Sequence, residues 1–285
     1  MQLFHIKSVA LKKIIFGIIL ILNSICIGKT QDLTASNSHT VIDGIYTKSE
    51  RQPLLNEPYL NERDVLWEKR IWRELDLREK MNHHFSYQKE PLALILLNHA
   101  KSGSLTVYSN IDDAFTTALS VSELNCMTTK YDTVIVYDPD NYSENVVVVK
   151  EEFNPQHVIR YRIKEVWYFD SKLSRMNVRI LGIAPIVARF DDNGKYIGET
   201  PLFWVFYPKA REILTGYQVF NAQNEAAQMN WDDIFQIRYF SSYIVKENNV
   251  HDRRIKDYKV GVDVLYEAEA IQTSMFNYEQ DIWEK

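Results

Sequence analysis

Residues 158–207 read VIRYRIKEVWYFDSKLSRMNVRILGIAPIVARFDDNGKYIGETPLFWVFY, and this stretch decides the fold. From Ile159 to Phe169, mainly apolar side chains alternate with a set that begins basic, and a period of two residues is typical of a β-strand. The alternation resumes at Met176 after a turn-rich segment, so we expect an antiparallel return. Pro185 cannot donate a ladder hydrogen bond, which predicts a bulge or a sheet edge there.

The end of this stretch supplies further strands. Asn193-Gly194 marks a reversal, because this pair suits the positive φ of tight hairpin turns. Residues 202–207 have no polar face and predict a central strand that is covered on both sides. Residues 234–245 alternate and are rich in aromatic side chains, which favours another strand. We therefore predict an α+β fold with an antiparallel meander (residues 158–207 plus 234–245) covered by N-terminal and C-terminal helices.

The covering helices are expected at both ends of the chain. In residues 64–82, Trp67, Ile71 and Leu75 recur every four residues, which is typical of an amphipathic helix. Residues 262–283 predict the last helix, with an apolar stripe of Leu265, Ala268, Ile271, Met275, Tyr278 and Ile282. The shorter predicted elements are helices at 92–99, 112–119 and 209–215, a strand at 105–108, and a hairpin of 133–137 and 146–149 joined by 138–141.

The first 28 residues are typical of a secretory signal peptide. Lys7, Lys12 and Lys13 precede a short apolar run, and small residues precede a cleavage point after Gly28. An uncleaved anchor is disfavoured because a membrane span needs roughly 20 apolar residues. Lipidation of Cys26 is disfavoured because the residues before it do not fit a lipobox.

Composition and charge limit the function classes. The chain has 285 residues with 13% aromatic side chains, enough for a core and for large contact surfaces. Cleavage after Gly28 removes three lysines and no acid, which leaves 30 basic and 38 acidic residues and a net charge of about −8. An acidic chain is a poor candidate for nucleic acid binding. Cys126 remains as the only cysteine, so no internal disulfide is expected.

Residues 29–60 are polar and contain two prolines, so we interpret them as an extended arm ahead of a single α+β domain at 61–285. Leu54, Leu55 and Tyr59 give the arm apolar anchors with which it can dock on a neighbouring subunit. An unstructured tail is the alternative, and composition alone does not exclude it.

Known catalytic motifs are missing from the sequence. It contains no GxSxG elbow, HExxH pair, GxGxxG loop or Walker A loop. The adjacent pair His83-His84 points in two directions, which disfavours a metal site. Residues 191–194 lack the ligand spacing of a calcium loop. We therefore predict no catalytic, cofactor-binding or metal-binding residues, and no cofactor.

Four segments together resemble one known family. They are DVLWEKRIWRELDLREKMN (64–82), YFDSKLSRMNVRILGIAPI (168–186), PLFWVFYPKAREIL (201–214) and NWDDIFQIRYFSSYIVKENN (230–249). They resemble the GldN/PorN family of the Bacteroidetes, and the resemblance covers about residues 60–285. It implies a periplasmic, non-catalytic component of the type IX secretion system that is needed for gliding motility in gliding species.

The resemblance also implies partners. Family members form a ring with an outer-membrane lipoprotein of the GldK/PorK type, at the inner face of the outer membrane and without inserting into it. The periplasmic part of a GldM/PorM-type motor is thought to engage this ring. Ring subunits associate through heterologous contacts that close. Our candidates for interaction residues are Leu54, Leu55, Tyr59, Trp67, Trp72, Trp231 and Trp283, although the four tryptophans suit a core equally well.

Two other function classes stay open on the sequence alone. A periplasmic enzyme or binding protein that acts on cell-wall material would show a cleft with a perturbed pair of acids. A small-ligand carrier would show one large apolar pocket. A ring component would instead show shallow surfaces with exposed aromatic patches.

Overall fold

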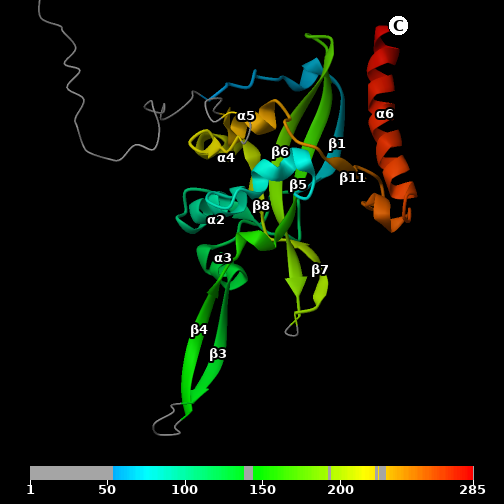
Figure 1. Ribbon diagram of the computed structural model, residues 1–285. Helices are drawn as coiled ribbons and strands as arrows, with labels where there is room; N and C mark the ends of the chain where they lie inside the picture. Colours follow the sequence, from blue (N-terminus) through cyan, green and yellow to red (C-terminus); the bar gives the residue numbers. More distant parts are fainter. Residues whose placement is uncertain (1–53, 138–143, 192–193, 222–223, 225–228, 285) are drawn as a thin grey trace, which may run out of the picture. The chain divides into compact units, whose positions relative to one another are not determined.

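An antiparallel sheet forms the centre of the computed structural model, which describes residues 54–137, 144–191, 194–221, 224 and 229–284 (Figure 1). Its strand order is β11-β1-β5-β6-β8-β2, and β7 pairs with β6 beside β8. The strands are β1 (Val65–Asp76), β2 (Val107–Tyr108), β5 (Val158–Asp170), β6 (Arg175–Phe190), β7 (Tyr196–Pro201), β8 (Trp204–Phe206) and β11 (Tyr243–Glu247). The predicted signal peptide and most of the predicted arm lie outside the described residues.

The β5–β8 segment confirms the predicted meander and the α+β class. Strand β8 is interior, as expected, but it is only three residues long because the helix α4 begins at Tyr207. The interruption expected at Pro185, a bulge or an edge, takes the form of a change of partner, because β6 passes there from β8 to β7 on one side. The register of β5 and β6 shifts between Val158 and Arg160, opposite the residues just after Pro185, and again between Lys164 and Glu165.

Residues 64–82 are not a helix, and this prediction is wrong. They form the short 3-10 turn η1 (Glu62–Asp64), the strand β1 and the start of a 3-10 helix, η2 (Lys80–Ser86). Trp67, Ile71 and Leu75 are an even number of residues apart, so the same spacing that fits a helix also fits one face of a strand. Strand β1 pairs with β5 along its whole length, and part of β1 also pairs with β11. These two ladders decide its conformation.

Two further segments depart from the expected elements. Residues 231–236 form the helix α5 (Trp231–Gln236), which starts at a capping box between Asn230 and Asp233, and strand β11 begins only at Tyr243. Residues 112–119 are irregular, with Phe115 at a φ of 58°. The helix α3 (Val121–Thr128) follows them and starts at a capping box of its own.

The remaining elements agree with the sequence. They are α2 (Leu92–Lys101), α4 (Tyr207–Leu214), α6 (Asp263–Trp283) and the hairpin β3 (Thr129–Tyr137) with β4 (Glu144–Glu152), whose predicted turn lies outside the described residues. Short pieces complete the fold: β9 (Gln218–Val219), β10 (Met229–Asn230), η3 (Pro155–His157) and η4 (Ile255–Asp257). Among the described residues, no helix is long and apolar enough to cross a membrane.

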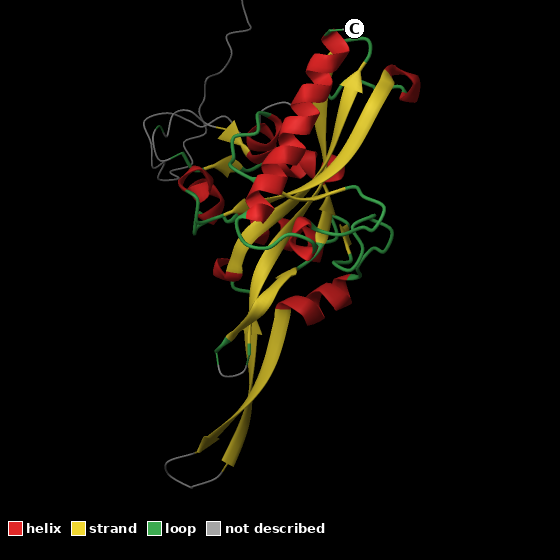
Figure 2. Ribbon diagram, turned by 90° about the vertical axis from the view of Figure 1, so that its right-hand side faces the viewer, coloured by secondary structure: helices red, strands yellow, loops and turns green. Residues whose placement is uncertain are grey.

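Apolar side chains gather in two main clusters on the sheet. The larger one joins α2, α4 and α5 to the middle strands through residues such as Leu96, Ile183 and Phe235. The second joins α6 to β1 and β11 through residues that include Ile71, Ile244, Ile271 and Met275. Figure 1 places α6 beside β11, and Figure 2 shows it lying across the strands. Leu265 is the exception in the predicted stripe of α6, because its side chain is 57% exposed.

Gly182 on β6 provides a test of the packing. A Cβ atom added there would overlap the Phe115 ring, which is itself packed against Trp204 and Phe206. We expect Gly182→Ala to lower the free energy of unfolding by about 1–3 kcal/mol. Gly198→Ala on the neighbouring strand β7 is the matched control, because nothing lies within 4 Å of its added Cβ. Equal urea midpoints for the two variants would contradict this packing.

Candidate interaction surfaces

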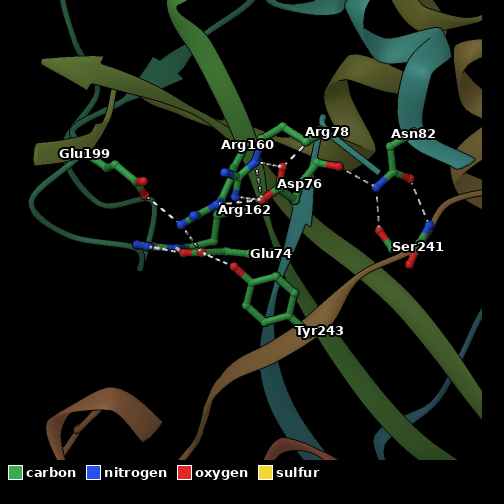
Figure 3. Close-up of polar contacts among 9 residues, drawn as sticks. All are labelled: Glu74, Asp76, Arg78, Asn82, Arg160, Arg162, Glu199, Ser241 and Tyr243. Atoms are coloured by element: carbon green, nitrogen blue, oxygen red, sulfur yellow. Dashed lines mark hydrogen bonds and ion pairs between the residues drawn. The ribbon is translucent and has the colours of Figure 1, made fainter. Parts of the chain in front are cut away.

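Charged side chains form a network across three strands at one end of the sheet (Figure 3). Glu74 and Asp76 of β1 lie directly opposite Arg162 and Arg160 of β5. The Arg162 guanidinium donates to Glu74 at 2.6 Å, and Arg160 contacts Asp76 at 3.4 Å and Glu199 at 2.7 Å. Facing pairs of opposite charge stabilise an antiparallel ladder, so this network fixes the register of β1 on β5.

Asn82 extends the same network toward β11. Its amide group donates to the carbonyl oxygens of Asp76 and Ser241 and accepts from the Ser241 N–H. The hydroxyl of Tyr243 donates to Glu74 at 3.2 Å. Asn82 is fully buried, so these bonds lie away from solvent and hold the start of β11 against the end of β1.

The protonation of this network does not suit acid–base catalysis. Paired hydrogen bonds from Arg78 hold the pKa of Asp76 at about 2, against the opposing effect of burial. A glycosidase general acid needs the opposite, a carboxyl group that stays protonated near neutral pH. The cluster therefore offers no support for an enzyme that acts on cell-wall material.

The histidine pair lies on η2. Burial lowers the pKa of His84 to about 4, so its ring is neutral at pH 7. His84 contacts the rings of Phe85 and Tyr239. Among the described residues, no group of three His, Cys, Asp or Glu side chains is placed to hold a metal ion.

The described end of the predicted arm lies on its own chain. Arg211 of α4 donates to the Leu55 carbonyl at 2.7 Å and pairs with Glu57 at 3.2 Å, and Arg179 of β6 donates to the Pro58 carbonyl. Asp232 of α5 pairs with the same Arg211 at 2.9 Å and holds its guanidinium in place. We name residues 54–60, held in this way by polar contacts, the latch segment.

The structure divides the predicted interaction residues into exposed and buried ones. Leu54, Leu55 and Tyr59 of the latch segment are exposed, and Tyr59 reaches 89%. Trp283 is 66% exposed, and Trp67 stacks on Tyr278 of α6 with 4.9 Å between the ring centroids. Trp72 and Trp231 are buried in the core. Trp67 is partly buried against the α6 cluster, so the surface candidates are Leu54, Leu55, Tyr59 and Trp283.

The exposed surface of α6 carries apolar side chains, of which the sequence had identified only Trp283 as an interaction candidate. Leu265, Phe276 and Trp283 are separated by 11 and 7 residues, nearly three and two whole turns, so they align along the helix. They are exposed, as are their neighbours Val262 and Tyr266. We name these five residues the α6 outer stripe. The signal was present in the sequence as a second apolar periodicity beside the buried one.

An open groove of about 800 Å³ lies between η2, α5 and the β9–β10 pair. We name it the η2–β10 groove. Its apolar lining includes Met81, Tyr87, Phe220, Met229, Ile234 and Tyr239. Lys80, His83 and Lys89 also line it, and its described lining contains no acidic side chain.

Comparison of the sequence with known protein families finds a matching family model. The model for the gliding motility associated protein GldN matches residues 60–284. The chain belongs to the GldN family. GldN membership confirms the resemblance drawn from the four sequence segments and associates the chain with gliding motility and type IX protein secretion. No curated protein matches the chain.

The charge network predicts a pH-dependent stability. The pKa of Asp76 falls from 3.8 to about 2 on folding, so its contribution is complete above pH 3.8 and is lost as the pH falls through about 2. We expect Asp76→Asn to lower the free energy of unfolding by about 1 kcal/mol at pH 7, because the exposed position of Arg78 weakens the pair.

This difference should shrink below pH 3.8 and disappear near pH 2 in thermal melts. Asp281→Asn on the exposed side of α6 controls for the lost charge and should change stability by less than about 0.5 kcal/mol. A constant difference between Asp76→Asn and the parent across this pH range would contradict the role of Asp76.

The latch segment gives a second prediction for this region. Glu57→Ala removes the carboxylate that pairs with Arg211, so chymotrypsin should cleave the latch segment faster while the core strands stay intact. Glu62→Ala, three residues before β1 and exposed, is the control and should leave the cleavage rate in the latch segment unchanged. An unchanged cleavage rate in Glu57→Ala would mean that the ion pair does not hold the segment.

Proposed function

We propose that the chain is a non-catalytic structural component of the type IX secretion system in the periplasm. In this role it forms a ring with an outer-membrane lipoprotein of the GldK/PorK type and supports protein secretion and gliding. The observation that carries the proposal is the GldN match, which spans residues 60–284 and so includes every strand of the sheet. Location at the inner face of the outer membrane, through the lipoprotein, belongs to the same proposal.

The surface of the domain supports an assembly role. The latch segment and the α6 outer stripe expose eight apolar side chains in all, counting Leu54, Leu55 and Tyr59 with the five stripe residues. Exposed apolar patches on a soluble domain are typical of protein–protein contacts, and aromatic residues dominate the binding energy of such contacts. A periplasmic domain of the GldM/PorM-type motor is a further partner in this proposal.

The ion-pair network suits a component that transmits mechanical force. Glu74, Arg160 and Arg162 tie neighbouring strands side by side, in addition to the backbone ladder. The pair of Glu165 with Arg238 at 2.9 Å links the middle of β5 to the loop after α5 in the same way. These bonds hold β1, β5 and the loop after α5 together.

Co-purification tests the proposal. Residues 29–285 are mixed with the lipoprotein encoded in the same genome and followed by sizing and negative-stain microscopy. We expect large rings only when both proteins are present. A monodisperse chain that does not bind the lipoprotein would contradict the proposal, and cell-wall fragments would then be screened as ligands.

A further inference from the structure

The α6 outer stripe needs a partner that the described residues do not supply. Ala268, Ile271 and Met275 are the side chains of this 21-residue helix that are buried against the sheet. The aligned residues Leu265, Phe276 and Trp283 lie about a quarter of a turn around the helix from them and are 57%, 49% and 66% exposed. A helix with a second apolar stripe is typical of one that docks into a groove.

The charge on α6 specifies the chemistry of that partner. Residues 260–284 contain six acidic side chains and no lysine or arginine: Asp263, Glu267, Glu269, Glu279, Asp281 and Glu284. Of these, Glu267 pairs with Lys259 at 3.4 Å and Glu279 accepts a hydrogen bond from the Met176 N–H. A surface that accepts α6 is therefore apolar in its floor and basic at its rim.

The η2–β10 groove has an apolar floor and a basic rim. Tyr87 and Phe220 stack with parallel rings 4.6 Å apart at the groove, and Met81 adds a side chain that adapts to irregular partners. Lys80 and Lys89 are exposed beside these apolar groups.

We propose that α6 of one copy docks through its outer stripe into the η2–β10 groove of a second copy. The inference rests on the proposed function and deepens it, because it names the contact between neighbouring ring subunits. The two surfaces belong to different elements: α6 packs on β11 and η4, whereas the groove lies between η2, α5 and β10. Such a contact is heterologous, and repeated contacts of this kind form a ring when the rotation between neighbouring copies closes.

Disulfide trapping tests which surfaces meet. In a Cys126→Ser background of residues 29–285, Gln280→Cys is placed beside the stripe in one tagged chain and Gln88→Cys beside the groove in another; both positions are exposed. With the lipoprotein present, we expect a disulfide-linked pair only when both chains are mixed. A linked pair from Gln280→Cys alone would indicate contact between two α6 helices and would overturn the inference.

Surface variants test the chemistry of the contact. Phe276→Asp puts a charge into the stripe, and Lys80→Glu combined with Lys89→Glu reverses the charge at the groove. Each should weaken self-association by about tenfold or more. Ile111→Asp is the matched control, because Ile111 is an exposed apolar residue outside both surfaces, and it should have no effect. If Phe276→Asp weakens self-association and the groove variant does not, the groove is not the acceptor and the inference fails.

Binding of the lipoprotein is measured separately from self-association. The proposed function and the α6 contact can therefore be overturned independently of each other. A chain that never co-purifies with the lipoprotein overturns the proposed function, and trapping in concentrated solutions of the chain alone still tests the α6 contact. Rings that form with no disulfide-linked pair overturn only the inference. If Phe276→Asp abolishes lipoprotein binding and leaves self-association intact, α6 binds the lipoprotein and the inference is wrong.

Discussion

The pairing of β1 with β5 is the constraint on which the other parts of the domain depend. The ladder runs from Val65 opposite Asp170 to Asp76 opposite Arg160, and it places the first described strand between the central meander and the strand β11 near the end of the chain. Without it, β11 would have no neighbour in the sheet, and α6 would lose the surface formed by Ile71 and Ile244. The arginine–carboxylate pairs between β1 and β5 act on the same ladder, so backbone and side chains specify one register.

The meander was predictable because its evidence is local. Strands β5 and β6 show alternation over many residues and are bounded by turn residues, and nothing outside the stretch is needed to recognise them. Strand β1 was not predictable in this way. Its apolar residues recur every four positions, which a helix and a strand satisfy equally, and its conformation depends on partners far along the chain. The capping boxes at Ser120 and Asn230 show the reverse case, because they are local signals for α3 and α5, and at α5 the alternation of residues 234–245 obscured the signal.

The surfaces were only partly predictable, because exposure depends on the whole fold. The tryptophans illustrate this. Trp72 lies under the amino groups of Lys164 and Lys246, 5.2 and 4.4 Å from its ring centroid, whereas Trp283 lies in solvent at the end of α6. The residues next to Trp72 and Trp283 in the sequence do not show which tryptophan is buried and which is exposed. The stripe on α6 was readable as a periodicity, but its exposure to solvent was known only once the sheet had covered the neighbouring face of the helix.

The position of β1 also governs the order in which the chain folds. Glu74 pairs with Arg162, which lies 88 residues further along the chain, and Arg73 pairs with Ser242, which lies 169 residues further along. Contacts this distant form slowly, because long loops are closed before any stabilisation is gained. As the chain is made from its N-terminus, β1 therefore waits as an unpaired strand with two tryptophans until β5 has emerged, and its other edge stays open until β11 follows. A chaperone that shields residues 65–76 during this interval would raise the yield of folded protein.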